Sequence, residues 1–436
     1  MMTQQSVIEM SVPFELAYCS VVRSYVESSS LAMGLGEDEA RSLMSAADEL
    51  FSYLCREYAP TAKARILCTG GIYFVRIDFV FPFAKLDLHA LNLARPVCAG
   101  DFARSSEAGL AVVARVVDRF EMDYNRENYI RMSISKNKEY PATADGPAPA
   151  QPVTGQYKIT APDTEEIKAI SQALRAASGA ECCPRSFAVP GKLADMVIAG
   201  DYEARIVRGH RGELGGCILW HSMTEKTVEC FGPFVFGAAA AEAMAKDLIE
   251  SCLNAIARTK AQSLICRQTG MVPPPGYFEH LGSYSMKRRE GGSFLTSTYY
   301  RSIGEDEGAV VWCSPGFDDY LRAEYDRLVF PRQIRIAQNH GETRGARSVI
   351  SADFDGDQSL ITLNPVLSGT DNGANIAAHQ DLTRRENILN AFFQVDLGLA
   401  WQTEFMPPLR ELGFVPRMVL PNAGAGDLVV FTWERD

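Results

Sequence analysis

Glu49 and Tyr53 stand four residues apart in the segment Asp38–Glu57, which we predict to be helical. A magnesium ion needs hard oxygen ligands in tight octahedral geometry. A neutral phenol, with a pKa of about 10, is a poor ligand of this kind. Tyr53 therefore argues against magnesium-dependent phosphate chemistry at this helix, and Glu49 taken by itself is compatible with an ordinary exposed helix position.

Two further segments contain residues that could contact a nucleotide. Asp78 opens the run Asp78-Phe79-Val80-Phe81-Pro82-Phe83, and Gly109 opens the amphipathic segment Gly109–Phe120, predicted to be a helix. The amino end of a helix can receive a phosphate group. The alternatives are that the aromatic run fills a hydrophobic core and that Gly109 is an ordinary helix start.

Residues 12–136 resemble the small ATPase domains of bacterial anti-sigma-factor serine kinases, members of the GHKL (Bergerat-fold) group. The resemblance implies that Glu49 is a general base, that Asp78 receives the adenine amino group and that Gly109 lies near phosphate. In that family an Asn stands at Tyr53 and a Gly stands at Val80. We therefore expect a domain that keeps the fold, is not an active kinase or ATPase, and has ATP as its less favoured cofactor.

The same resemblance suggests partners. These ATPase domains act in pairs and grip a sigma factor or an antagonist, so it implies a protein partner of that kind or a homodimer. The net charge of −11 argues against general affinity for nucleic acid or an anionic membrane. No secretory signal is visible at Met1–Met10, and the scattered cysteines form no zinc-binding pattern. We expect a cytoplasmic protein without a metal site.

A chain of 436 residues is long enough for two to four domains at about 100–200 residues each. Pro, Ala and Gly dominate Tyr140–Gln156, which predicts a linker between an N-terminal domain, 1–139, and the rest. In the N-terminal part the expected order is strand, helix, helix, strand, strand, helix, strand. This order predicts an α/β sandwich of the Bergerat type, with helices on one face of a mixed or antiparallel sheet.

The C-terminal part is predicted to contain a duplication. Gly292–Arg301 matches Gly426–Arg435 at an offset of 134 residues. Before each match lies a predicted helix that ends in Leu-Gly, at Phe278–Gly282 and Leu409–Gly413. A predicted strand precedes each helix, at Ser263–Arg267 and at Ala391–Leu397. A repeat at this spacing indicates two copies of one domain.

These units, 157–303 and 304–436, resemble GNAT acetyltransferases, which implies two mixed-sheet α/β domains. GNAT enzymes hold the pyrophosphate of acetyl-CoA with a glycine-containing loop that opens a helix after the central strand. The matching loops contain Gly237 and Ala238 in the first unit, and Gly369 and Gly373 in the second. These four residues are the candidates for binding acetyl-CoA or another acyl-CoA. Asp371 in the second loop would repel phosphate, so that loop could instead be a plain helix cap.

No catalytic residue is predicted, because the six histidines are isolated and form no recognisable motif. The hypothesis that best fits the whole chain is a bacterial regulatory or adaptor protein. Its degenerate ATPase-like domain would bind proteins, and its tandem GNAT-like domains would sense a small ligand such as an acyl-CoA. The alternative is a working N-acetyltransferase, since that chemistry needs mainly positioning and a general base.

Overall fold

The structure is a computed structural model that describes the following residues. These are 6–59, 61–82, 116–125, 129–141, 153, 155–176, 183–236, 241–269, 276–338, 341, 343–355 and 358–434. The chain forms two compact units. The first is Met1–Pro141 with Gly345–Ser351 and Gly369–Leu382, and the second is Ala142–Arg344 with Ala352–Ser368 and Thr383–Asp436.

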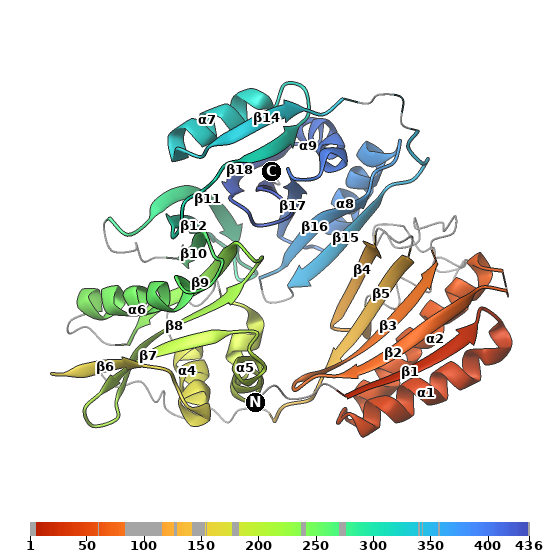
Figure 1. Ribbon diagram of the computed structural model, residues 1–436, viewed down its shortest axis with the longest axis horizontal. Coiled ribbons are helices and arrows are strands. Elements are labelled where there is room, and N and C mark those ends of the chain that lie inside the picture. Colours follow the sequence, from red (N-terminus) through yellow and green to blue (C-terminus); the bar gives the residue numbers. More distant parts are fainter. Residues whose placement is uncertain are drawn as a thin grey trace. The chain divides into compact units, whose positions relative to one another are not determined.

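The N-terminal sheet has five antiparallel strands in the order β1-β2-β3-β5-β4. Its strands are β1 (Ser6–Pro13), β2 (Lys63–Gly70), β3 (Phe74–Pro82), β4 (Arg119–Asn125) and β5 (Tyr129–Asn137). The helices α1 (Cys19–Ala32) and α2 (Glu37–Glu57) lie along one face of it (Figure 1). A short 3₁₀ helix, η1 (Leu16–Tyr18), leads into α1.

The face of β3 that packs against the helices carries Phe79 and Phe81, both fully buried. Phe81 meets Phe14 edge to face at 5.8 Å, and Phe14 in turn stacks on Phe51 of α2. Because side chains alternate across a strand, Asp78 points to the opposite face. The aromatic run that includes Phe79 and Phe81 is therefore core, as one of the two readings of this segment expected.

The α/β fold class is confirmed, and one N-terminal element was placed wrongly. The predicted helix Gly109–Phe120 cannot reach Phe120, because β4 begins at Arg119 and pairs with β5 along its whole length. This strand was not predicted. Its partner β5 begins four residues after β4 ends, and Phe120, Met122 and Tyr124 alternate with polar residues, so a local strand pattern was present and was missed. Residues 109–115 lie outside the described residues.

A sheet of seven strands dominates the second unit, in the order β11-β12-β10-β9-β8-β7-β6. Only β9 and β10 pair in parallel. The strands are β6 (Tyr157–Thr160), β7 (Glu203–Gly209), β8 (Leu214–Ser222), β9 (Thr227–Val235), β10 (Ser263–Thr269), β11 (Glu279–Lys287) and β12 (Ser293–Ser302).

Helices cover both faces of this sheet (Figure 1). One core combines α4 (Thr164–Ala176) and α5 (Pro190–Ala199) with Phe231 of β9. The other combines α6 (Ala241–Ile256) with Cys230 of β9 and Cys266 of β10. The short helix η4 (Arg185–Ala188) precedes α5. Alternate residues of β9 therefore face different helices.

A second sheet has five strands in the order β15-β16-β17-β19-β18, with β16 and β17 in parallel. Its strands are β15 (Val349–Asp355), β16 (Leu360–Leu367), β17 (Asn390–Asp396), β18 (Phe414–Leu420) and β19 (Leu428–Trp433). The remaining elements are β13 (Ala309–Cys313), β14 (Arg332–Ile336), α7 (Asp318–Leu328), α8 (Asn372–Arg385), η5 (Ala400–Phe405) and α9 (Met406–Glu411).

The strand order is duplicated, without the helix that was expected at Phe278–Gly282. The order β9-β10-β12-β11 recurs as β16-β17-β19-β18, and α6 and α8 each follow the first strand of the parallel pair. We call 157–303 the first copy and 304–436 the second copy.

One predicted element in this region is wrong. Phe278–Gly282 is not a helix, because β11 starts at Glu279 and pairs with β12. The helix α7 ends at Leu328, where Val329 adopts a left-handed conformation and β14 follows. The dipeptide Leu-Gly follows a helix in the second copy and lies inside a strand in the first. It was therefore not a reliable marker of a helix end.

Candidate active site

The parallel ladder between β9 and β10 stops in the middle of the sheet. Its pairs run from Thr227 with Ser263 to Phe231 with Arg267, although β9 continues to Val235 and β10 to Thr269. Gly232-Pro233, joined by a cis peptide bond, comes directly after the last pair. Proline has no N–H to donate to a ladder. An interruption of this kind inside a sheet is a place where a ligand backbone could meet the strands.

Beside this interruption lies a buried carboxylate, that of Glu229, which is 5% exposed. One of its oxygens is 2.7 Å from Nε of Arg267, and the other is 3.1 Å from Nε2 of His221. The strands position all three residues. His221 on β8 pairs with Glu229 on β9. Arg267 is the last residue of β10 in the parallel ladder with β9. We call these residues the Glu229 cluster.

The charge state of Glu229 follows from its neighbours. Burial would raise the pKa of this carboxyl, but Arg267 and then His221 more than offset it, so the pKa lies below its ordinary value. Glu229 is therefore an ionised, acceptor-only group that can orient the imidazole of His221. A carboxylate that orients an imidazole is an arrangement suited to general-base catalysis.

The Glu229 cluster lies on the α4–α5 face of the sheet, among aromatic rings. The His221 ring stacks on Phe231 at 5.9 Å and contacts Tyr202 at 5.0 Å. The side chains of His221 and Arg267 remain 26% and 30% exposed. The cluster thus combines a buried carboxylate with two polar side chains that solvent or a substrate can reach.

The sequence did not predict these three residues. His221 and Glu229 are eight positions apart, and Arg267 comes much later, so only the pairing of three strands brings them together. One signal was available. Thr227–Val235 is an apolar run with a single acidic residue, and an acid in a buried strand needs charged partners.

The second copy repeats the interruption without the charges. Its last parallel pair is Leu363 with Phe393, and Asn364-Pro365 follows as Gly232-Pro233 does in the first copy. By this register Ile361 occupies the position of Glu229, and Phe393 occupies that of Arg267. Both are buried. The second copy therefore lacks the carboxylate and the guanidinium of the first.

The loop predicted to bind acyl-CoA in the second copy is packed against its own chain. A Cβ on Gly369 would lie 2.3–2.5 Å from the backbone of Arg347 and Ser348. Asp371 accepts a hydrogen bond of 2.6 Å from the Ser348 amide. Gly373 is the second residue of α8, and the Asn372 side chain accepts from the amide of Gly369, which precedes the helix. The polar groups of this loop are thus engaged by the chain's own backbone.

In the first copy the corresponding residues, Gly237 and Ala238, lie outside the described residues. The description resumes at Ala241, where α6 begins. Their assignment to acyl-CoA stays a prediction.

The two nucleotide candidates that fall on described residues, Glu49 and Asp78, do not converge. Glu49 is half-buried on α2, and Tyr53 is fully buried. Asp78 lies on the sheet face away from the helices, where Ser133 donates to it at 2.6 Å and Arg76 pairs with it at 3.1 Å. The carboxylate assigned to an adenine amino group is thus engaged by the protein. Gly109 lies outside the described residues.

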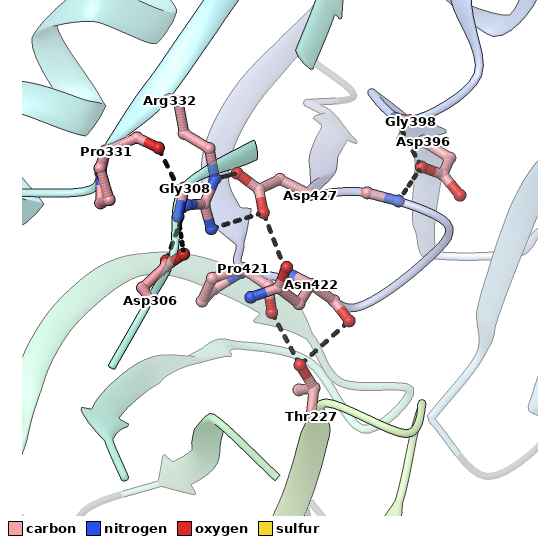
Figure 2. Close-up of polar contacts among 11 residues, drawn as sticks. Thr227, Asp306, Gly308, Pro331, Arg332, Asp396, Gly398, Pro421, Asn422 and Asp427 are labelled. Atoms are coloured by element: carbon pink, nitrogen blue, oxygen red, sulfur yellow. Dashed lines mark hydrogen bonds and ion pairs between the residues drawn. The ribbon is translucent and has the colours of Figure 1, made fainter. Parts of the chain in front are cut away.

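A second buried charge cluster has a structural role. Figure 2 shows Arg332 held between Asp427 and Asp306, each 2.7 Å away. Asp427 also accepts from the Asn422 amide, and the hydroxyl of Thr227 donates to the Pro421 and Asn422 carbonyls. Thr227 begins β9, so this network joins the two copies. We call it the Arg332 network.

Within the described ranges, no helix is long and apolar enough to cross a membrane. The same ranges contain no group of three or more His, Cys, Asp or Glu side chains that could hold a metal ion.

No protein-family model and no curated protein sequence matches the chain. Among solved structures, similar chains include an N-acetyltransferase from Staphylococcus aureus, at 11% identity and a TM-score of 0.28. A GNAT-superfamily phosphinothricin acetyltransferase from Sinorhizobium meliloti, solved with AcCoA, shows 16% identity and a TM-score of 0.28. An aminoglycoside 6'-N-acetyltransferase from Enterococcus faecium shows 9% and 0.26. Each alignment covers 34% of this chain and 100%, 89% and 98% of the three neighbours, respectively. These likenesses are too distant to assign an activity, so the proposals below rest on this chain's own residues.

Proposed function

We propose that the first copy transfers an acyl group from an acyl-CoA to an amine. The observation that carries this proposal is the Glu229 cluster, a buried ionised carboxylate with a partly exposed imidazole, placed directly beside the end of the β9–β10 ladder. The equivalent place in the second copy carries Ile361 and Phe393. One site of this kind per chain is therefore proposed.

The chemistry assigned to the cluster is a proton transfer. With its Nε2–H donating to Glu229, His221 presents the Nδ1 lone pair as the acceptor. The amine nitrogen attacks the thioester carbonyl carbon, its proton passes to His221, and the carbon–sulfur bond breaks. The departing thiolate then takes the proton from His221. Arg267 keeps Glu229 ionised throughout, which stabilises the imidazolium that forms.

The acyl-CoA supplies the activated thioester, and the chain offers a fitting place for it. The interrupted ladder supports an extended ligand, and the loop before α6 is the place expected for phosphates. Tyr202 and Phe231 provide an apolar wall around the reacting groups.

The test is a thiol-release assay with acetyl-CoA and a panel of primary amines. His221→Gln should lower kcat by about 100-fold or more, as expected for loss of a general base. Glu225→Gln is the matched control, since Glu225 is exposed and pairs only with the exposed Lys260 among the ion pairs described. Unchanged kcat in a folded His221→Gln protein would contradict the role given to His221. Absence of amine-dependent thiol release in the wild type would contradict the proposed function.

A second candidate function concerns the N-terminal domain. We propose that it is a protein-binding domain without ATP turnover, in line with a regulatory or adaptor role and a partner such as a sigma factor or its antagonist. The observation that favours it is the surface of β1 and α1. β1 is an edge strand among the described strands, and Val7, Leu16 and Val21 are 54%, 59% and 47% exposed.

An exposed edge strand can accept a strand from another chain. If a second copy of this protein is that partner, Val21→Asp should shift the sedimentation profile toward a smaller species. The exposed Ser20→Asp on the same helix is the control. A monomeric wild type would exclude the homodimer and leave a different protein as the partner to be sought. Magnesium-dependent ATP hydrolysis would contradict this candidate.

A further inference from the structure

The interrupted ladder of the second copy is bridged by one side chain, that of Gln402 in η5. Its carbonyl oxygen accepts a hydrogen bond of 2.8 Å from the amide of Asp396 on β17. Its amide nitrogen donates at 3.3 Å to the carbonyl of Pro365 on β16. Both backbone groups lie beyond Leu363 and Phe393, the last pair of the ladder. Gln402 therefore links the two strands where they no longer link each other.

Gln402 and two other residues of η5 are buried. Gln402 is 8% exposed, and Thr403 and Phe405 of the same short helix are almost fully buried. The Phe405 ring lies 5.8 Å from that of Phe393, the residue that replaces Arg267 of the first copy. Side chains of η5 thus fill the second copy at the position where the first copy holds its charged cluster.

One carboxamide satisfies one backbone donor and one backbone acceptor on two different strands. A secondary amide of a bound molecule could make the same two hydrogen bonds, since it also carries one N–H and one C=O. The complementarity of the slot is therefore that of an amide, and in this chain a glutamine side chain provides the amide.

We propose that the gap between β16 and β17 is an amide-binding slot that Gln402 occupies permanently, which closes the second copy to acyl-CoA. The slot itself rests only on the geometry of Gln402, whereas the statement that one acyl-CoA binds per chain also rests on the proposed function.

The test uses the full chain and pantetheine, which carries two secondary amides, as the probe in titration calorimetry. Gln402→Ala removes the carboxamide and leaves its space, so it should bind one more pantetheine per chain than the wild type. Gln402→Met, which fills the space without a donor or acceptor, is the matched control and should gain none. Equal binding by folded Gln402→Ala and wild-type chains would overturn the proposal.

Hydrogen exchange provides a readout that needs no ligand. The Asp396 amide should exchange at least tenfold faster in Gln402→Met than in the wild type, because its acceptor is lost. An unchanged rate would overturn the proposal even if Gln402→Ala fails to fold. If the wild type binds no acetyl-CoA while Gln402→Ala gains a pantetheine site, the proposed function fails and the amide slot stands.

Discussion

At the scale of single residues, the ionisation of Glu229 depends on Arg267. The carboxylate is buried on a strand of mainly apolar side chains. The attraction of Arg267 is the strongest single effect that lowers its pKa. Without Arg267, the Glu229 carboxyl would stay protonated up to a higher pH, because burial alone disfavours its charged form.

Arg267→Met should therefore destabilise the protein in a pH-dependent way. Breaking a fully buried ion pair costs about 3–5 kcal/mol, and we expect about 2 kcal/mol here because Arg267 is 30% exposed. With the pKa of Glu229 raised in the variant, the loss should shrink as the pH falls and the carboxyl becomes protonated. Urea unfolding at pH 7 and pH 5 measures this, with Arg267→Lys as the control. An equal deficit at both values would contradict it.

At the scale of elements, two reciprocal hydrogen bonds between Asp163 and Glu166 close the start of α4. The amide of Asp163 donates to Glu166 at 2.8 Å, and the amide of Glu166 donates to Asp163 at 2.9 Å. This reciprocal capping box satisfies two amides that the helix itself leaves without partners. The carboxylate of Glu166 also pairs with Arg208 of β7.

Asp163→Ala should lower the free energy of unfolding by about 1 kcal/mol, the usual effect of losing such a cap. Asp163→Asn keeps an oxygen that can accept from the helix and should lose much less. Chemical denaturation of both variants measures the difference. Equal losses in the two would mean that the charge of Asp163, rather than the cap, stabilises α4.

Elements with strong local signals were predicted, and contacts between distant strands were not. The helix α2 and the hairpin β2–β3 each have their pattern within a few residues. The strands β4 and β11 pair with the next strand along the chain and were missed, whereas Arg267 reaches the Glu229 cluster from a distant part of the sequence. The sequence shows an acid in an apolar run. Without the register of β8, β9 and β10 it does not show that His221 and Arg267 contact this acid.

At the scale of the second unit, the Arg332 network lies within the second copy and reaches the first copy through Thr227. The side chains of Arg332 and Asp427 are both 0% exposed and share two hydrogen bonds, of 2.7 and 3.2 Å. Removal of Asp427 would leave the buried Arg332 with Asp306 as its remaining acid among the described ion pairs, whereas removal of both Arg332 and Asp427 leaves no buried guanidinium to compensate.

Asp427→Leu should therefore destabilise the unit by about 3–5 kcal/mol, more than the double variant Arg332→Met with Asp427→Leu. Thermal unfolding of the single and double variants measures this relation. A double variant that loses as much as the two single losses added together would show that the pair acts through other contacts, such as that of Asp427 with Asn422.

The contact of Thr227 with Pro421 and Asn422 also has a mechanical consequence. The turn between β18 and β19 accepts hydrogen bonds from Thr227, the first residue of β9, which is the strand that carries Glu229. A pulling force applied at the C-terminus acts first on β19 and then on this turn, which passes it to the central strand of the other copy. Under tension in an optical trap, the two copies should yield together in one extension step and not one after the other.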